Sequence, residues 1–233
     1  MSGRQIHHGR VTMRSKKAVV LLSGGLDSST VLFYALSKGF KVNVLIFNYG
    51  QRHKKEISKA KKIAEIAGVS YQIVKLNIPW GGSVLLDKES QLPKAVLKRK
   101  KIPATYVPAR NIIFLSLALS YAEVISANEV FIGANAVDFS GYPDCRPAFI
   151  KAFQKAADTG TKSAVEGRRI KISAPLINLS KKEIIKLGLK LGVPFKYTWS
   201  CYSGGRLPCA KCDSCLIRAK GFEEAGVKDP LFK

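Results

Sequence analysis

The sequence predicts an α/β protein in which an open parallel sheet has helices on both faces and a small zinc-binding annex follows at the C-terminus. Strand-like apolar runs alternate with segments of helical periodicity, which is the pattern of a parallel sheet with crossover helices. A glycine-rich turn directly follows the first apolar run, and ligands of such sheets bind at the carboxyl ends of the strands. Four of the five cysteines fall between residues 201 and 215, which sets the annex apart from the rest of the chain.

The first half of the chain alternates strand and helix signals. Ile57, Ala60, Ile63 and Ala64 have the spacing of one helical face, whereas "VNVLIF" is an apolar, β-branched run. We expect strands over 18–22, 42–47 and 71–76, and helices over about 28–37 and 54–67. From 79 to 108 the periodicity fades, and a loop of this length is more often functional than structural filler.

The second half continues the alternation. Residues 110–127 are strongly apolar and predict a helix, which is followed by a strand over 129–134. A helix near 147–158 and a short strand over 171–176 come next. Ser180 and Glu183 have the spacing of a capping box, and Gly192 closes the helix that they begin.

Composition bounds the organisation of the chain. It has 233 residues, of which 46% are apolar, and this is enough for one core and a small appended unit. We expect a flexible arm or cloning remnant over 1–13, a nucleotide-binding body over 14–196 and the annex over 197–233. No apolar run predicts a membrane span, and the polar N-terminus lacks the features of a secretory signal. Clustered cysteines favour a reducing, cytoplasmic setting.

The charge balance is strongly basic. Lysine and arginine number 39 against 16 acidic residues, and the resulting formal charge of +23 attracts nucleotides, RNA or counterions. Much of the charge lies in "RHKKEISKAKK" and in residues 98–101. An RNA-binding surface and solvated helix faces are both compatible with this pattern.

The turn "SGGLDSS" after the first strand is typical of a phosphate site. Gly24 and Gly25 permit close backbone approach, so backbone amides, serine hydroxyls and the following helix N-terminus can surround one anion. No lysine follows at the P-loop spacing, so γ-phosphoryl transfer of the usual kind is not expected, and no Gly-x-Gly-x-x-Gly fingerprint is present. Asp27 would repel phosphate unless it orients backbone amides or holds Mg²⁺. The alternative is a plain glycine-rich turn capped by serines.

The clustered cysteines indicate a metal site. Cys201, Cys209, Cys212 and Cys215 have ligand spacing, and four thiolates complete a tetrahedral zinc site with no open position, as in structural zinc. An iron–sulfur cluster and redox disulfides are the alternatives. Cys145 stands apart, either as a nucleophile assisted by Arg146 or as an inert thiol.

The glycine turn resembles the pyrophosphate loop of the ATP pyrophosphatases. Ser23, Gly24, Gly25, Asp27 and Ser28 match the S-G-G-x-D-S motif of that superfamily, whose members cleave ATP between the α- and β-phosphates and attach AMP to a substrate oxygen. The resemblance implies a Rossmann-like fold of the adenine nucleotide alpha hydrolase type. A loop that holds departing pyrophosphate needs no lysine directed at the γ-phosphate.

Further motifs narrow the resemblance to the 7-cyano-7-deazaguanine synthase family, which serves queuosine and archaeosine precursor biosynthesis. They are "FNYGQRHKKEI", "VPARN", "GANAVDFSGYPDCRP", "APL" and "TWSCYSGG…PCAKCDSC", and the similarity covers residues 18–226. The resemblance implies a C–N ligase that adenylates 7-carboxy-7-deazaguanine, forms the amide with ammonia and then adenylates the amide oxygen to give the nitrile. It also implies ATP with Mg²⁺, zinc on the four clustered cysteines, and a homodimer.

The same resemblance implies the nucleotide-binding residues. The expected ATP segment comprises Leu22, Ser23, Gly24, Gly25, Leu26, Asp27, Ser28, Ser29, Thr30, Val31 and Leu32. Tyr49 and Arg52 follow the second strand and are expected to contact ATP, while His53 contacts adenylate or shuttles a proton from ammonia. A polar helix start is the alternative for Arg52 and His53. The candidate catalytic residues are Asp27, Ser28, His53 and Arg110.

Polar groups in the later motifs suit a purine-like base. The expected substrate-binding residues are Asp138, Ser140, Tyr142, Asp144 and Arg146. An aspartate would accept from the base, Tyr142 would stack on it, and Arg110 or Arg146 would hold the carboxylate through two hydrogen bonds. Each residue has an alternative as a turn, loop cap or helix start, although a cation is unfavourable at the start of a helix. Ala148 departs from the family, which often has an acidic residue there.

Two other functions are compatible with the sequence. A tRNA-modifying enzyme could apply the same adenylation directly to a tRNA base, although cysteines committed to metal argue against sulfur transfer. A non-catalytic zinc module that binds nucleic acid fits the α/β body poorly. We expect small-molecule substrates and no stable nucleic-acid partner. No glutaminase domain is present, so ammonia would come from free ammonium or a separate protein.

Overall fold

The computed structural model describes residues 15–87, 102–137 and 141–232. Its centre is a five-stranded sheet in the order β3-β2-β1-β4-β5, and each neighbouring pair is parallel. The strands are β1 (Lys17–Leu21), β2 (Lys41–Asn48), β3 (Ser70–Lys75), β4 (Glu129–Phe131) and β5 (Lys171–Ser173). The predicted open parallel sheet is confirmed.

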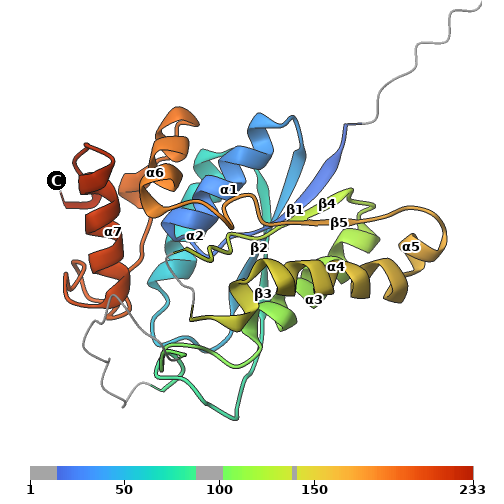
Figure 1. The fold of residues 1–233 in the computed structure, drawn as a ribbon, viewed down its shortest axis with the longest axis horizontal. Helices are drawn as coiled ribbons and strands as arrows, with labels where there is room; N and C mark the ends of the chain where they lie inside the picture. Colours follow the sequence, from blue (N-terminus) through green and yellow to red (C-terminus); the bar gives the residue numbers. More distant parts are fainter. Residues whose placement is uncertain (1–14, 88–101, 138–140, 233) are drawn as a thin grey trace, which may run out of the picture.

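Helices cover both faces of the sheet, as predicted (Figure 1). One layer contains α1 (Leu26–Ser37), α2 (Lys55–Ile66), α6 (Lys181–Lys190) and α7 (Asp213–Glu224), and the other contains α3 (Arg110–Val124) and α4 (Pro147–Gly160). The short α5 (Lys162–Val165) follows α4. The 3₁₀ turns in the described ranges are η1 (Pro143–Cys145), η2 (Phe195–Tyr197) and η3 (Pro230–Phe232). Within the described ranges, no helix is both long enough and apolar enough to cross a membrane.

The strand side chains alternate between two cores. Ala18 and Val20 of β1 face the core shared with α1, α2 and α6, while Val19 and Leu21 face the core beneath α3 and α4. All four side chains are buried. Both faces of the sheet are therefore apolar, which is why its strands read as continuous hydrophobic runs in the sequence.

Two strands are shorter than predicted. Those expected over 129–134 and 171–176 end at Phe131 and Ser173. Beyond β4 the chain crosses the start of α1, where a Cβ on Gly133 would lie 3.0 Å from the Ser28 amide nitrogen. The helix expected over 110–127 ends at Val124, because Ser126 takes a positive φ of 53° that no helix continues.

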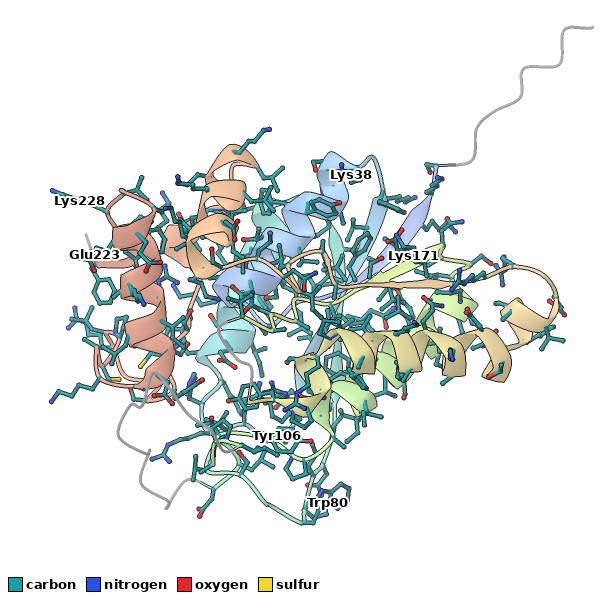
Figure 2. All side chains as sticks on the ribbon, in the orientation of Figure 1. Lys38, Trp80, Tyr106, Lys171, Glu223 and Lys228 are labelled. Carbon is teal, nitrogen blue, oxygen red and sulfur yellow. The ribbon has the colours of Figure 1, made fainter. Side chains whose placement is uncertain are left out.

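The long loop predicted over 79–108 is described in two arms, 79–87 and 102–108. The arms lie side by side, because the Val84 amide donates to the Ala104 carbonyl oxygen at 3.2 Å. Figure 2 shows Trp80 and Tyr106, one from each arm, at the same end of the molecule. The predicted arm over 1–13 and the basic segment 98–101 lie outside the described residues.

The C-terminal annex extends the layer that holds α6. Arg218 of α7 is 3% exposed, and its guanidinium donates to the Asp229 carboxylate at 2.6 and 2.8 Å and to the Thr198 hydroxyl at 2.7 Å. Phe222 of the same helix enters the core beneath α1 and α6. Because breaking a buried ion pair costs about 3–5 kcal/mol, the Arg218–Asp229 pair stabilises the annex internally. Phe222 packs the annex against the body.

Candidate active site and metal cluster

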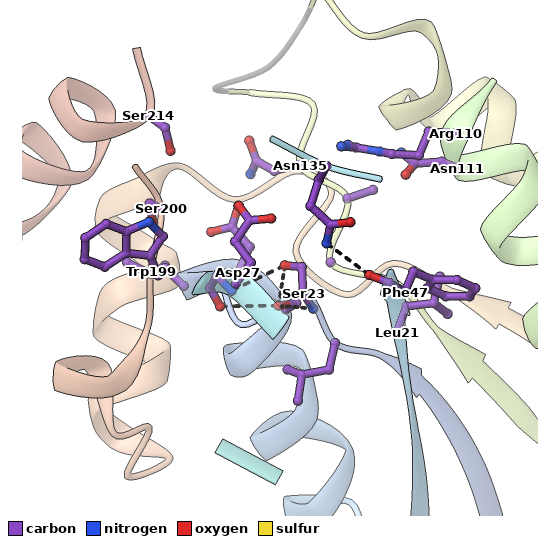
Figure 3. A pocket seen from close by; sticks show the side chains of 18 of the residues that line it. Leu21, Ser23, Asp27, Phe47, Arg110, Asn111, Asn135, Trp199, Ser200 and Ser214 are labelled. Atoms are coloured by element: carbon purple, nitrogen blue, oxygen red, sulfur yellow. Dashed lines mark hydrogen bonds between the residues drawn. The ribbon is translucent and has the colours of Figure 1, made fainter. Parts of the chain in front are cut away.

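The strand order of the sheet reverses between β1 and β4. The chain runs outward from β1 to β2 and β3, then returns and places β4 on the other side of β1. Ligand crevices of open α/β sheets form at this point, beyond the carboxyl ends of the strands. A cavity of about 270 Å³ is found there. Figure 3 shows Asp27 toward one end and Arg110 with Asn111 toward the other. We call them the glycine-loop end (residues 23–28 with Lys181) and the arginine end (Arg110, Asn111, Tyr142 and Cys145).

The glycine-loop end is built from one continuous stretch. The hydroxyl oxygens of Ser23 and Ser28 lie 3.0 Å apart, and Ser28 Oγ accepts from the Ser23 amide at 3.1 Å. Gly24 has a φ of +80°, and a Cβ there would lie 2.5 Å from the Glu56 carbonyl oxygen. Only glycine fits this position, because both the conformation and the contact exclude a side chain.

The residues of the expected ATP segment fall into two groups. Those that line the cavity are Leu22, Ser23, Gly25, Leu26, Asp27 and Ser28. Ser29 is fully buried, and its hydroxyl donates to the Gly25 carbonyl oxygen at 2.7 Å instead of facing an anion. Thr30, Val31 and Leu32 are buried within α1. The second group therefore supports the loop from behind.

A lysine does reach the glycine loop, but from a distant part of the chain. Lys181, the first residue of α6, is 7% exposed, and its Nζ donates to both Asp27 carboxylate oxygens at 2.7 and 2.8 Å. Gly221 of α7 leaves room for it, because a Cβ there would overlap the lysine stem. Both members of this ion pair line the cavity. Lys181 was not among the site residues expected from the sequence. A lysine at a helix start, where the dipole disfavours a cation, was the available signal.

The arginine end is assembled from separate segments. Arg110 begins α3, lines the cavity and donates to the Tyr49 hydroxyl at 3.3 Å. Ala109 before it has a φ of 54°, and this left-handed conformation costs a non-glycine residue about 1–2 kcal/mol. The strained turn directs the first turn of α3, with Arg110 and Asn111, into the cavity.

Tyr142 joins the arginine end to two other segments. Its hydroxyl lies 2.6 Å from Thr105 Oγ1 in the long loop and shares a hydrogen bond with Tyr202 of the annex. Burial raises the pKa of Tyr142 and of Tyr202, so both are neutral hydroxyls near pH 7. Both tyrosines line the cavity. The expectation that Tyr142 faces the ligand therefore has a geometric basis.

Other expected substrate residues lie elsewhere. The Asp144 carboxylate is 5% exposed and accepts from the Asn111 amide at 3.1 Å, so it satisfies a free amide at the start of α3. Arg146 is exposed, and neither residue lines the cavity. Asp138 and Ser140 lie outside the described residues. The substrate roles of these four residues stay predictions.

Cys145 lines the cavity as a buried thiol. The Asn111 side-chain amide donates to its Sγ at 3.4 Å. Burial raises the pKa of Cys145 to about 11, so the sulfur is a protonated thiol at neutral pH. This environment favours the inert alternative over the nucleophile.

Glu56 is a second cavity carboxylate, and the sequence analysis did not select it. It lies in the first turn of α2, against the glycine loop. Burial raises the pKa of Glu56 to about 7, while the positive charge of Arg110 acts in the opposite direction. The one sequence signal was an acidic residue within the basic stretch "RHKKEISKAKK".

The site residues expected just after β2 have two locations. Tyr49 and Arg52 line the cavity, whereas His53 lies beside the cysteine cluster. Arg52 Nη1 also donates to the Asp87 carbonyl oxygen at 3.2 Å. His53 is not part of the lining. Its Nε2 lies 3.1 Å from the Cys201 carbonyl oxygen, its ring packs against Gly204, and burial lowers its pKa. This position gives the predicted proton shuttle no support.

The four clustered cysteines meet in space, as predicted. The Sγ atoms of Cys201, Cys209, Cys212 and Cys215 all lie within 4.8 Å of one another. Four thiols at this spacing suit a single metal ion. The annex therefore contains a cluster able to bind metal.

Trp199 connects the cysteine cluster to the glycine loop. Its amide donates to the Gly24 carbonyl oxygen at 2.8 Å, and its indole N–H donates to the Cys201 carbonyl oxygen at 2.8 Å. Lys55 Nζ lies 3.9 Å from the centroid of the indole ring. The segment before the first cysteine thus braces the loop that shapes one end of the cavity.

Comparison with known proteins gives a consistent result. Residues 17–226 match the family model described as "Queuosine biosynthesis protein QueC". The chain is 52% identical over 221 residues to the 7-cyano-7-deazaguanine synthase of Thermoplasma acidophilum, which covers 94% of this chain and 92% of the relative. Identity to the synthase of Trichodesmium erythraeum is 53% over 220 residues, covering 92% and 99% of the two chains. Identity to that of Acetivibrio thermocellus is 54% over 218 residues, covering 93% and 97%. With this coverage and identity, the chain belongs to the queuosine biosynthesis protein family QueC.

Proposed function

We propose that the protein converts 7-carboxy-7-deazaguanine and ammonia into 7-cyano-7-deazaguanine, in two adenylations that each release pyrophosphate and AMP. The first adenylation activates the carboxylate for attack by ammonia. The second activates the amide oxygen, whose departure with AMP gives the nitrile. The close relatives carry the name of this activity.

One observation supports this function above others. A single cavity joins a glycine loop suited to phosphates to an end with a half-buried arginine and neutral tyrosine hydroxyls. ATP and a carboxylated base could therefore meet in it, with the α-phosphate near the carboxylate. Nothing in the described cavity favours a tRNA base over the free base.

At the glycine-loop end, we assign the backbone amides near Gly25 and the hydroxyls of Ser23 and Ser28 to the departing pyrophosphate. The α1 N-terminus supplies further positive potential. Lys181 supplies the cation that the loop itself lacks, and Asp27 fixes its ammonium group. Preorganised donors of this kind stabilise the charge that develops on leaving phosphates.

At the arginine end, we assign the substrate carboxylate to Arg110 and the base to the neighbourhood of Tyr142. An arginine can hold a carboxylate in two parallel hydrogen bonds. Tyr49 fixes the guanidinium from one side. Asp138 and Ser140, and less directly Asp144 and Arg146, stay candidates for reading the base.

We propose zinc for the cysteine cluster. Four sulfur ligands leave no open position, so the ion has a structural role in holding the annex. Mg²⁺ is proposed to arrive on the ATP phosphates, since this ion typically keeps several waters and few protein ligands.

We further propose that the chain works as a homodimer in the reducing cytoplasm, with no stable nucleic-acid partner. The family resemblance supports the dimer, and the free cysteines suit a reducing compartment. Light scattering would test the dimer, and salt-dependent retention of tRNA would contradict the absence of a nucleic-acid partner.

The function is tested by incubating the protein with 7-carboxy-7-deazaguanine, ATP, Mg²⁺ and isotopically labelled ammonium. The expected products are AMP, pyrophosphate and a nitrile that carries the labelled nitrogen. Release of ADP and orthophosphate, or product formation only on added tRNA, would overturn the proposal.

A further inference from the structure

Two carboxylates line the described cavity, and their surroundings differ. Asp27 is paired with the Lys181 ammonium through two short contacts. Among the described residues, none forms a hydrogen bond or salt bridge with the Glu56 carboxylate. Burial raises the pKa of Glu56, whereas the positive charge of Arg110 of α3 lowers it. Its carboxylate is thus kept in the cavity without a fixed partner.

The position of Glu56 is set by the backbone around it. Its carbonyl oxygen faces Gly24, so the first turn of α2 lies directly against the loop assigned to the leaving phosphates. Arg110, assigned above to the substrate carboxylate, is close enough to act electrostatically on Glu56. Glu56 therefore lines the cavity beside the glycine loop and within electrostatic reach of Arg110.

The proposed chemistry needs a proton acceptor at this place. When ammonia attacks the acyl adenylate, a C–N bond forms, the C–O bond breaks with its electron pair on AMP, and nitrogen loses one proton. When the amide oxygen attacks the α-phosphorus, pyrophosphate leaves. The resulting cation must lose two nitrogen protons as the C–O bond to AMP breaks and the nitrile forms. No redox change occurs, and each proton needs a base near nitrogen.

We propose that Glu56 is the base that accepts these nitrogen protons in both halves of the reaction. This inference rests on the function proposed above. Between steps the carboxyl returns its proton to solvent through the open cavity, so one group serves both halves. A carboxylate that titrates near neutral pH is well matched to such transfers, because it is neither too weak a base nor permanently protonated.

The test compares Glu56→Gln and Glu56→Asp with a control on the same helix, Glu65→Gln. Glu65 lies in the last turn of α2 in an exposed ion pair with Lys62. Three rates are measured: exchange of labelled pyrophosphate into ATP with the carboxylated base alone, nitrile formation at saturating ammonium, and nitrile formation from the amide without ammonium.

In Glu56→Gln we expect exchange to stay within about threefold of wild type, while both nitrile rates fall on the order of 100-fold or more. Glu56→Asp should recover part of the loss, and Glu65→Gln should match wild type in every assay. Glu56→Gln keeps the size of the side chain, and retained exchange shows that the variant is folded.

Three results would overturn the inference. Equal loss of exchange and nitrile formation would make Glu56 a ligand for MgATP. Recovery of the wild-type nitrile rate at high ammonium would show that Glu56 only binds ammonium and is not the base. An unchanged nitrile rate would remove it from the chemistry. If wild-type protein shows neither exchange nor nitrile formation, the proposed function fails instead.

Discussion

The two ends of the cavity are made in different ways. The glycine-loop end comes mostly from residues 23–28, whose hydroxyls and amides bond to one another. The arginine end brings Arg110 and Tyr142 together from separate segments, and Tyr202 of the annex contacts it through Tyr142. A contiguous motif reveals its own geometry in sequence, whereas an assembled site depends on tertiary contacts that no short motif contains.

The difference also predicts how each end responds to mutation. Changes at the glycine-loop end should slow adenylation itself, because they alter groups that stabilise developing charge. Changes at the arginine end should mainly weaken substrate binding, because several weaker contacts share the task. The following variants test this contrast in order of decreasing expected effect.

The largest effect is expected for Gly24→Ala. The new Cβ would meet the Glu56 carbonyl oxygen in a positive-φ position. We expect a loss of about 3 kcal/mol in the free energy of unfolding and more than about 1000-fold in adenylation. Urea unfolding and pyrophosphate exchange measure the two. Gly39→Ala is the matched control, since Gly39 has a φ of +77° with no neighbour within 4 Å. Equal losses in both variants would contradict the role of close packing.

Lys181→Met should rank second. It keeps the apolar stem beside Gly221 and removes the cation that faces Asp27. Pyrophosphate exchange should fall on the order of 100-fold, because transition-state charge loses a preorganised partner. Exposed Lys182→Met serves as the control. If the lysine only neutralises Asp27, Asp27→Asn combined with Lys181→Met should restore the rate, and this result would exclude a direct role.

Cys212→Ser should lower stability and slow adenylation, although Cys212 does not line the cavity. Loss of one ligand should release the metal and lower the midpoint of thermal unfolding by about 10 °C. The rate of adenylation should fall by about 30-fold, because the segment that contains Trp199 braces the glycine loop. Elemental analysis, thermal scans and exchange assays check this. Full adenylation by metal-free protein would show that the brace does not depend on the cluster.

Tyr142→Phe should give a moderate effect at the arginine end. It removes a hydroxyl that links Thr105 and Tyr202. We expect KM for the carboxylated base to rise about tenfold with KM for ATP unchanged, which corresponds to one lost hydrogen bond. A fall in kcat with an unchanged KM would place Tyr142 in the chemistry and blur the contrast between the ends.

Cys145→Ser should have the smallest effect. Because the thiol has a raised pKa of about 11, it is protonated at pH 8 and should react slowly with iodoacetamide. Turnover should stay within about threefold of wild type. Mass spectrometry of alkylated protein and nitrile assays give the measurements. Complete loss of turnover would instead support a nucleophilic role for Cys145.

The sequence predicted a feature correctly where the residues that form it follow one another closely in the chain. Alternating apolar runs gave the parallel sheet, the motif around Gly24 and Gly25 gave the loop, and the four cysteines gave the metal cluster. Strand ends were less accurate, because tertiary crossings such as Gly133 over Ser28 decide where the chain leaves the sheet. Periodicity contains no record of such crossings.

Lys181 and Glu56 were missed for a related reason. Each is one charged residue among 39 basic and 16 acidic side chains, and only folding reveals which of them line the cavity. Asp144 shows the reverse error, since a carboxylate in a specific motif satisfies a helix amide instead of lining the cavity. Burial and partners, rather than residue type, separate these cases.

The hydrogen bond from Trp199 to Gly24 also concerns biosynthesis. Gly24 is translated long before Trp199, whose amide is its hydrogen-bond partner. An unfinished polypeptide therefore carries the nucleotide-gripping turn without the group that steadies it. The turn reaches its braced geometry only after the segment that contains Trp199 has been made and has folded against it.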